Sequence, residues 1–270
     1  MYSQHRRTKE RRLILPVESA KKAVRILFGK AKAMETEHIV KGYEEDLGRL
    51  DHMIAEMGGL VEAQLAEAID TLVKRDADRA MTIVEKDKQI DTLESEIDAF
   101  TIKLLAFRQP MAEDLRQIIT ALKVSSNLER IGDYAKNVAK RTVTLAKAPS
   151  MGDSTASLAR MATMVQSMIN NVLDAYIARD SDLADDVRMR DAEVDHLHSS
   201  LFRELLTYMM EDPRNITACA HLLFVAKNIE RMGDHVTSIA EQVHFLVQGE
   251  IPEDDRPKGD SSAFTLVEPK

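Results

Sequence analysis

The heptapeptide Asn127-Leu128-Glu129-Arg130-Ile131-Gly132-Asp133 recurs 101 residues later as Asn228-Ile229-Glu230-Arg231-Met232-Gly233-Asp234. Residues upstream of it also match in phase, now at an offset of 104, which pairs Asp87 with Asp191 and Asp91 with Asp195. A repeat of about a hundred residues is too long for a solenoid unit of roughly 20–50 residues. We therefore interpret the chain as an internal duplication of a domain or half-domain.

The composition predicts an all-α fold. Aromatic residues make up 4% of the 270 residues, Trp is absent, and there are only 10 Gly and 7 Pro. Apolar residues recur three and four positions apart, as at Val61, Leu65, Ala68 and Leu72, whereas no segment alternates as a strand does. Three helices are expected in each half, six in all.

Residues typical of helix caps and turns predict the helix ends and domain boundaries. Asp76 and Asp180 stand where an N-cap is expected, and Pro110 and Pro213 stand where a helix restarts. The run Pro149–Gly152 separates the halves. We expect a basic extension over residues 1–35, a first bundle over 36–148, a second over 153–248, and a disordered tail over 249–270.

Charge is distributed unevenly along the chain. Residues 1–33 carry a net charge of +8, which leaves −16 for the remainder of a chain whose net charge is −8. The acidic body argues against nucleic acid as a partner and favours cations. The basic extension is either a surface-seeking amphipathic stretch or a poorly ordered extension, or else the assigned start is too early and translation begins at Met34.

The cysteine content and the lengths of the apolar runs indicate the cellular compartment. A single cysteine, Cys219, excludes an internal disulfide and suits a reducing cytosol. No apolar run approaches the ~18 residues that a membrane-spanning helix requires. The sequence thus predicts a cytoplasmic protein without a membrane span.

The doubled heptapeptide places two carboxylates one helical turn apart. Glu129 and Asp133 share a helix face with Gly132 and Lys136. Paired acids repel each other, and a mid-helix glycine costs about 1 kcal/mol relative to alanine. Because both costs recur in the second copy, we expect something to offset them, and a cation shared by the carboxylates would do so.

The duplication supplies further carboxylates on the preceding helix of each half. In an antiparallel bundle that helix lies against the helix of the heptapeptide, so each half would offer four acids to Fe, Mn, Zn or Mg. The predicted metal ligands are Asp87, Asp91, Glu129 and Asp133 in the first half, and Asp191, Asp195, Glu230 and Asp234 in the second.

Two alternatives stay open at this point. Acidic pairs are common on solvated helix faces, where Arg130 and Arg231 would neutralise them as surface ion pairs worth under about 1 kcal/mol. The motifs Glu193-x-x-His196 and Glu241-x-x-His244 fit the pattern of ferritin-like di-iron bundles, which would indicate metal storage or redox chemistry. Neither of these two motifs has a counterpart in the first half.

The doubled Asn-x-Glu-Arg-x-Gly-Asp motif, Gln109-Pro110 followed by Asp114-Leu115-Arg116, and the Arg-Asp-x-Asp-x-x-Ala turns resemble the PhoU family. The resemblance covers about residues 36–248. It implies two antiparallel three-helix bundles related by pseudo-two-fold symmetry, with multinuclear metal clusters held in each bundle by its four of the eight carboxylates. Asn137 is matched by Ser238, so the two sites need not be equivalent in occupancy or metal.

The resemblance also implies a function. PhoU proteins are cytoplasmic regulators, not enzymes, that restrain phosphate uptake and phosphate-starvation signalling when phosphate is plentiful. The implied partners are the ATPase subunit of a phosphate ABC transporter, a phosphate-sensing histidine kinase and a second copy of the chain.

Overall fold

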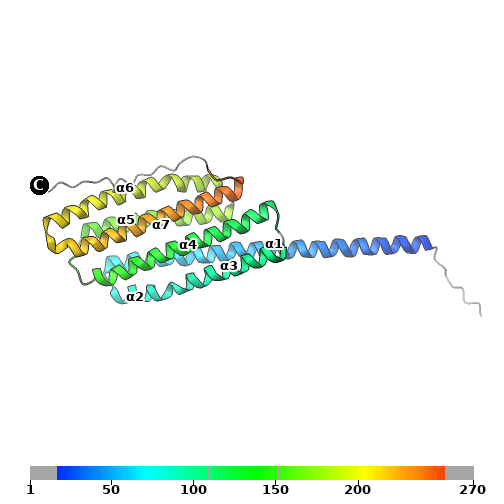
Figure 1. The fold of residues 1–270 in the computed structure, drawn as a ribbon, viewed down its shortest axis with the longest axis horizontal. Coiled ribbons are helices and arrows are strands. Elements are labelled where there is room, and N and C mark those ends of the chain that lie inside the picture. The colour runs from blue at the N-terminus through cyan, green and yellow to red at the C-terminus, as the bar shows by residue number, and fades with distance from the viewer. Residues whose placement is uncertain (1–16, 109, 151, 253–270) are drawn as a thin grey trace, which may run out of the picture. The chain divides into compact units, whose positions relative to one another are not determined.

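The computed structural model describes residues 17–108, 110–150 and 152–252, and every regular element in these ranges is helical (Figure 1). The elements in chain order are α1 (Val17–Lys74), α2 (Ala77–Lys86), α3 (Lys88–Arg108), α4 (Ala112–Leu145), α5 (Gly152–Ala178), α6 (Ser181–Glu211), a short 3₁₀ helix (Pro213–Asn215) and α7 (Ile216–Gln248). The predicted all-α fold is confirmed, as two pseudo-symmetric three-helix bundles.

One helix of the first half differs from the expectation. The helix predicted to run from Asp76 to the Gln109-Pro110 turn is divided at Asp87 into α2 and α3. The carbonyl of Asp87 accepts hydrogen bonds from the backbone N–H groups of Ile90 at 2.9 Å and Asp91 at 3.3 Å. The first of these bonds spans only three residues, so the helix is wound more tightly at this point but does not reverse direction. The interruption lies at Asp87, which is a predicted site residue.

The predicted helix starts are confirmed at atomic detail. Asp76 accepts a hydrogen bond from the backbone N–H of Arg79, and Asp180 accepts one from that of Leu183, both at 3.0 Å. Each satisfies a backbone donor that the first helical turn leaves without a partner. The duplicated Arg-Asp turns thus end one helix and begin the next in both halves.

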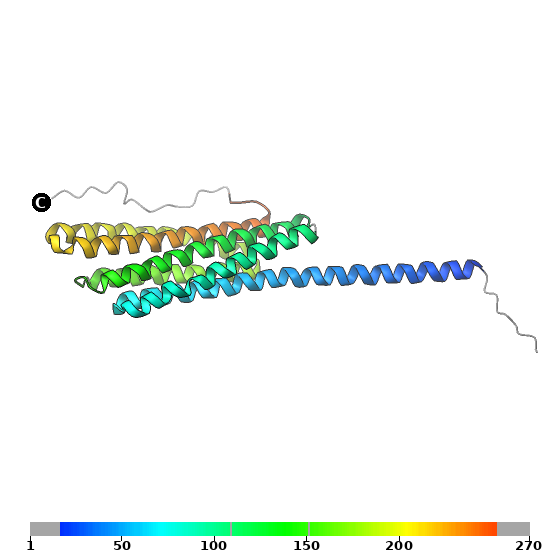
Figure 2. The same ribbon diagram turned by 60° about the horizontal axis from the view of Figure 1, so that its bottom comes forward.

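The chain divides into two compact units, Met1–Asp46 and Leu47–Lys270. The second unit contains both repeats, whose helices run side by side (Figures 1 and 2). Helices α4 and α7, which carry the two heptapeptides, pack against each other. Asn127 Oδ1 of the first heptapeptide lies 2.8 Å from Nδ1 of His235, which directly follows the second.

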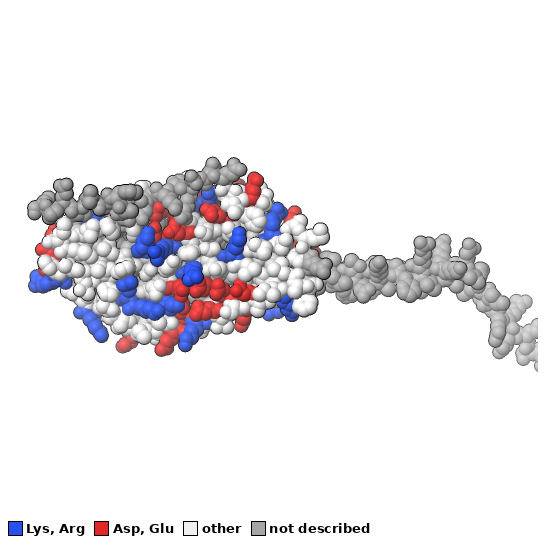
Figure 3. Space-filling model, in the orientation of Figure 1, with Lys and Arg blue, Asp and Glu red and all other residues white. Residues whose placement is uncertain are grey.

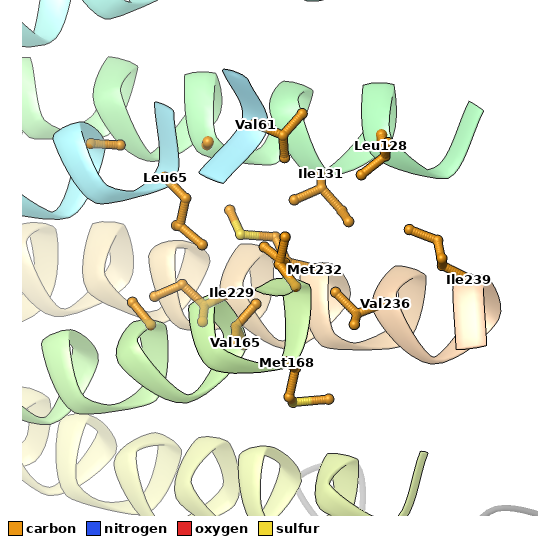
Figure 4. Packing of buried hydrophobic residues seen from close by; sticks show 14 of the residues in the cluster. Val61, Leu65, Leu128, Ile131, Val165, Met168, Ile229, Met232, Val236 and Ile239 are labelled. Atoms are coloured by element: carbon orange, nitrogen blue, oxygen red, sulfur yellow. The ribbon is translucent and has the colours of Figure 1, made fainter. Parts of the chain in front are cut away.

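The apolar residues of the two heptapeptides point into one shared core (Figure 4). Leu128 and Ile131 of α4 and Ile229 and Met232 of α7 are fully buried. Helices α1 and α5 complete this core with residues that are themselves equivalent in the duplication, such as Val61 and Val165. The repeated motif therefore builds the interface between the halves with one face and presents carboxylates from another.

The ends of the chain are only partly described. Helix α1 begins at Val17, and the rest of the predicted basic extension, residues 1–16, lies outside the described residues. Helix α7 ends at Gln248, where Gly249 adopts a left-handed φ of 87° as the C-cap. The predicted tail beyond residue 252 lies outside the described residues. None of the helices in the described ranges is long and apolar enough to cross a membrane.

Candidate functional site

The mid-helix glycines of both heptapeptides lie where a neighbouring helix approaches closely. A Cβ atom at Gly233 would stand 3.0 Å from Oδ1 of Asp191, and one at Gly132 would stand 3.0 Å from Cδ1 of Ile90 and 3.7 Å from Oδ1 of Asp87. A side chain at either position would press on the adjacent helix. The glycines therefore bring the predicted carboxylates of two helices together.

The first carboxylate cluster consists of Asp87, Asp91, Glu129 and Asp133, and Lys136 lies inside it. Nζ of Lys136 is 2.5 Å from Oδ2 of Asp87 and also pairs with Asp133. Gln64 of α1 donates through Nε2 to Oδ1 of Asp87 at 2.8 Å. Asp87 is 2% exposed. This buried carboxylate is thus held by two donors from two different helices.

The negative charges of the other acids in the first cluster are less well neutralised than that of Asp87. Glu129 is half-buried, and desolvation together with the negative charge of Asp133 raises its pKa to about 7. Burial, then the charge of Asp87, raises the pKa of Asp91. Glu94 of α3 joins the group, since burial and the charge of Asp98 raise its pKa. The duplication did not single out Glu94, because its equivalent in the second half is His198 and not an acid.

The raised pKa of Glu129 predicts a pH dependence for the metal-free protein. Below pH 4.5, its usual pKa, Glu129 is protonated in both folded and unfolded states. As pH rises to about 7, the unfolded chain releases this proton first, so the contribution of Glu129 to stability is lost. We expect Glu129→Gln to make the decline in the free energy of unfolding smaller, measured by urea unfolding between these pH values. Exposed Glu96→Gln is the control, and an unchanged decline in Glu129→Gln would contradict the assignment.

The second carboxylate cluster consists of Asp191, Asp195, Glu230 and Asp234, and the first three are buried. Oε1 of Glu230 accepts a hydrogen bond from Lys227 at 2.6 Å. Its Oε2 is buried and accepts no hydrogen bond from the described residues. Desolvation raises the pKa of Glu230 although Lys227 opposes it. A buried oxygen of this kind is costly unless something binds it.

The burial of the acidic side chains distinguishes a solvated helix face from a cluster inside the bundle. Asp91 is exposed, as the solvated-face reading expects, whereas Asp87, Asp191, Asp195 and Glu230 are buried. On the face drawn in Figure 3, Asp and Glu side chains gather in the middle with Lys and Arg beside and among them. The second cluster is therefore largely buried, whereas the first combines buried Asp87 with half-buried Glu129 and Asp133 and exposed Asp91.

The two clusters differ in how well their side chains could bind a metal ion. Across the described ranges, no group of three or more His, Cys, Asp or Glu side chains is arranged to hold a metal ion. In the first cluster the Lys136 ammonium stands between two of the acids, so these residues do not fit a metal as they are arranged. In the second, Lys227 pairs with Oε1 of Glu230 only, and the buried Oε2 supplies an oxygen ligand of the type that Mg, Mn and Fe accept.

The di-iron pattern is not assembled. Glu193 and His196 are both exposed on α6. Nδ1 of His244 lies 3.0 Å from the backbone carbonyl of Glu250, two residues beyond the end of α7. These motifs therefore do not converge on the carboxylate clusters.

Comparison with known proteins identifies the family. The family model described as "PhoU domain" matches twice, at residues 54–142 and 158–243. A phosphate-specific transport system accessory protein PhoU homolog of Caulobacter vibrioides is 50% identical over 225 residues, which cover 83% of this chain and 98% of that protein. The homolog of the same name from Zymomonas mobilis is 49% identical over 228 residues, which cover 84% and 96%.

Solved structures give the same result. The crystal structure of PhoU from Pseudomonas aeruginosa superposes with a TM-score of 0.73 at 38% identity, covering 77% of this chain and all of that one. PhoU from Streptococcus pneumoniae gives a TM-score of 0.73 at 26% identity, covering 78% and 99%. With two family domains in tandem and relatives matched over nearly their whole length, the chain belongs to the PhoU family.

Proposed function

We propose that this chain is a cytoplasmic adaptor that negatively regulates phosphate uptake and phosphate-starvation signalling when phosphate is plentiful. The observation that carries the proposal is the 50% identity to a phosphate-specific transport system accessory protein over 98% of that protein's length. An adaptor acts by changing which complexes are populated. The proposed partners are the ATPase subunit of a phosphate ABC transporter, a phosphate-sensing histidine kinase and a second copy of the chain.

The proposal includes metal binding at the second cluster. Asp191, Asp195, Glu230 and Asp234 would hold a Mn, Fe, Zn or Mg ion through carboxylate oxygens. Their side chains would have to move together to do so, because no three of them are arranged around one ion as they stand. A bound cation would add positive charge beside Lys227, which pairs with Oε1 of Glu230 at 2.6 Å. The buried Oε2 of Glu230 supports this part of the proposal, because such an oxygen gains most from a ligand.

Deletion of the gene tests the regulatory role. In phosphate-replete cells we expect deletion to raise secreted phosphatase activity, because the restraint on starvation signalling is lost, and restoration of the gene to silence it. Restoration with the exposed-site variant Glu96→Gln serves as a control and should silence activity equally. Low phosphatase activity that deletion leaves unchanged would contradict the regulatory role.

A further inference from the structure

We propose that Lys136 is the built-in cation of the first cluster, so that the chain binds metal in only one of its two bundles. The contrast between the two bundles rests on the proposed function, because it assumes that the second cluster binds metal. The claim about Lys136 itself stands on the contacts of the first cluster.

The contacts place the Lys136 ammonium where a shared cation would lie. Nζ pairs with Asp87 of the α2–α3 junction and with Asp133 of α4, and so bridges the two helices. The side chain of Lys136 is 20% exposed and that of Asp87 is 3% exposed, which shields the pair from solvent. A metal ion could bind these two acids together only by displacing the ammonium.

Gln64 completes the arrangement around Asp87. Its Nε2 donates to Oδ1 of Asp87 at 2.8 Å and to the carbonyl of Gly132 at 3.0 Å. Oδ1 and Oδ2 of Asp87 are therefore both engaged by groups of the chain. Arg130 Nε lies 3.5 Å from Oε2 of Glu129 and adds a second positive charge at the edge of the cluster.

The second cluster lacks both of these donors at the equivalent positions. Gln64 corresponds to Met168, and Lys136 corresponds to Thr237. Met168 cannot donate a hydrogen bond, and the Thr237 hydroxyl donates to the backbone carbonyl of Asp234 at 2.8 Å. The nearby Lys227 is 40% exposed, and among the described residues neither it nor any other group donates to Oε2 of Glu230. The duplication has thus diverged at the two residues that neutralise Asp87.

The test measures bound Mn²⁺ per chain by elemental analysis after equilibrium dialysis of the full-length protein against MnCl₂. The variants are Lys136→Met, the charge-retaining Lys136→Arg and the matched control Lys140→Met, an exposed lysine one turn further along α4. Each is also made in a background of Asp191→Asn and Glu230→Gln. Should Lys136→Met fail to fold by circular dichroism, Lys136→Gln replaces it.

We expect Lys136→Met to gain about one Mn²⁺ per chain in both backgrounds, because a cation site of oxygen ligands has been opened. Lys136→Arg and Lys140→Met should match the parent chain. No gain in Lys136→Met, or loss of Mn²⁺ from the parent chain on Asp87→Asn, would overturn the inference. A parent chain without Mn²⁺ together with a gain in Lys136→Met would overturn metal binding by the second cluster and support the role of Lys136.

Discussion

Ile131→Ala is expected to lower the free energy of unfolding by about 2–4 kcal/mol, since it removes buried methyl groups and leaves a cavity. Ile131 is fully buried on α4 and lies near Leu128 and Met232 in the core shared by the two halves (Figure 4). Urea unfolding followed by far-UV circular dichroism measures the change. The loss would show that one face of the heptapeptide carries the packing between the halves.

The matched control is Ile102→Ala on α3. Ile102 is 64% exposed, so the same substitution should change the free energy of unfolding by no more than about 0.5 kcal/mol. Equal losses at the two positions would show that burial in this core does not determine the effect.

The fold could be predicted from the sequence because its signals are local and repeated. The spacing of Leu128 and Ile131, copied at Ile229 and Met232, predicts a buried helix face, and the aspartates before α2 and α6 predict helix starts. The division at Asp87 could not be predicted in this way. It accompanies contacts with Gln64 and Lys136, which come from other helices.

The candidate site was predicted only in part. Duplication marked all eight carboxylates, and the structure brings Asp87 close to Asp133 through Lys136. The bridging role of Lys136 could not be predicted, because a lysine three residues after an acid is ordinary on a helix surface. Its reach to Asp87 depends on how α4 packs against the α2–α3 junction. Burial of Asp191 and Glu230 likewise depends on packing and not on spacing.

In metal-free buffer, Lys136→Met is expected to lower the free energy of unfolding by about 3 kcal/mol. The substitution leaves Asp87 as a buried carboxylate whose charged partner is gone, and breaking a buried pair costs far more than breaking an exposed one. Burial lowers the pKa of Lys136, but its hydrogen bonds to Asp133 and Asp87 outweigh burial and raise it overall. The ammonium therefore stays charged throughout the neutral range, and urea unfolding at neutral pH measures its full contribution.

Addition of Mn²⁺ separates the loss of charge from a general packing defect. If the vacated position accepts the ion, Mn²⁺ at about a hundred times its dissociation constant should restore about 2.7 kcal/mol of stability to Lys136→Met. Lys140→Met, whose side chain is exposed, should lose no more than about 0.5 kcal/mol without metal. A loss in Lys136→Met that Mn²⁺ does not reverse would mean that the lysine supports the helices by packing, because a cation of the right charge would then fail to replace it.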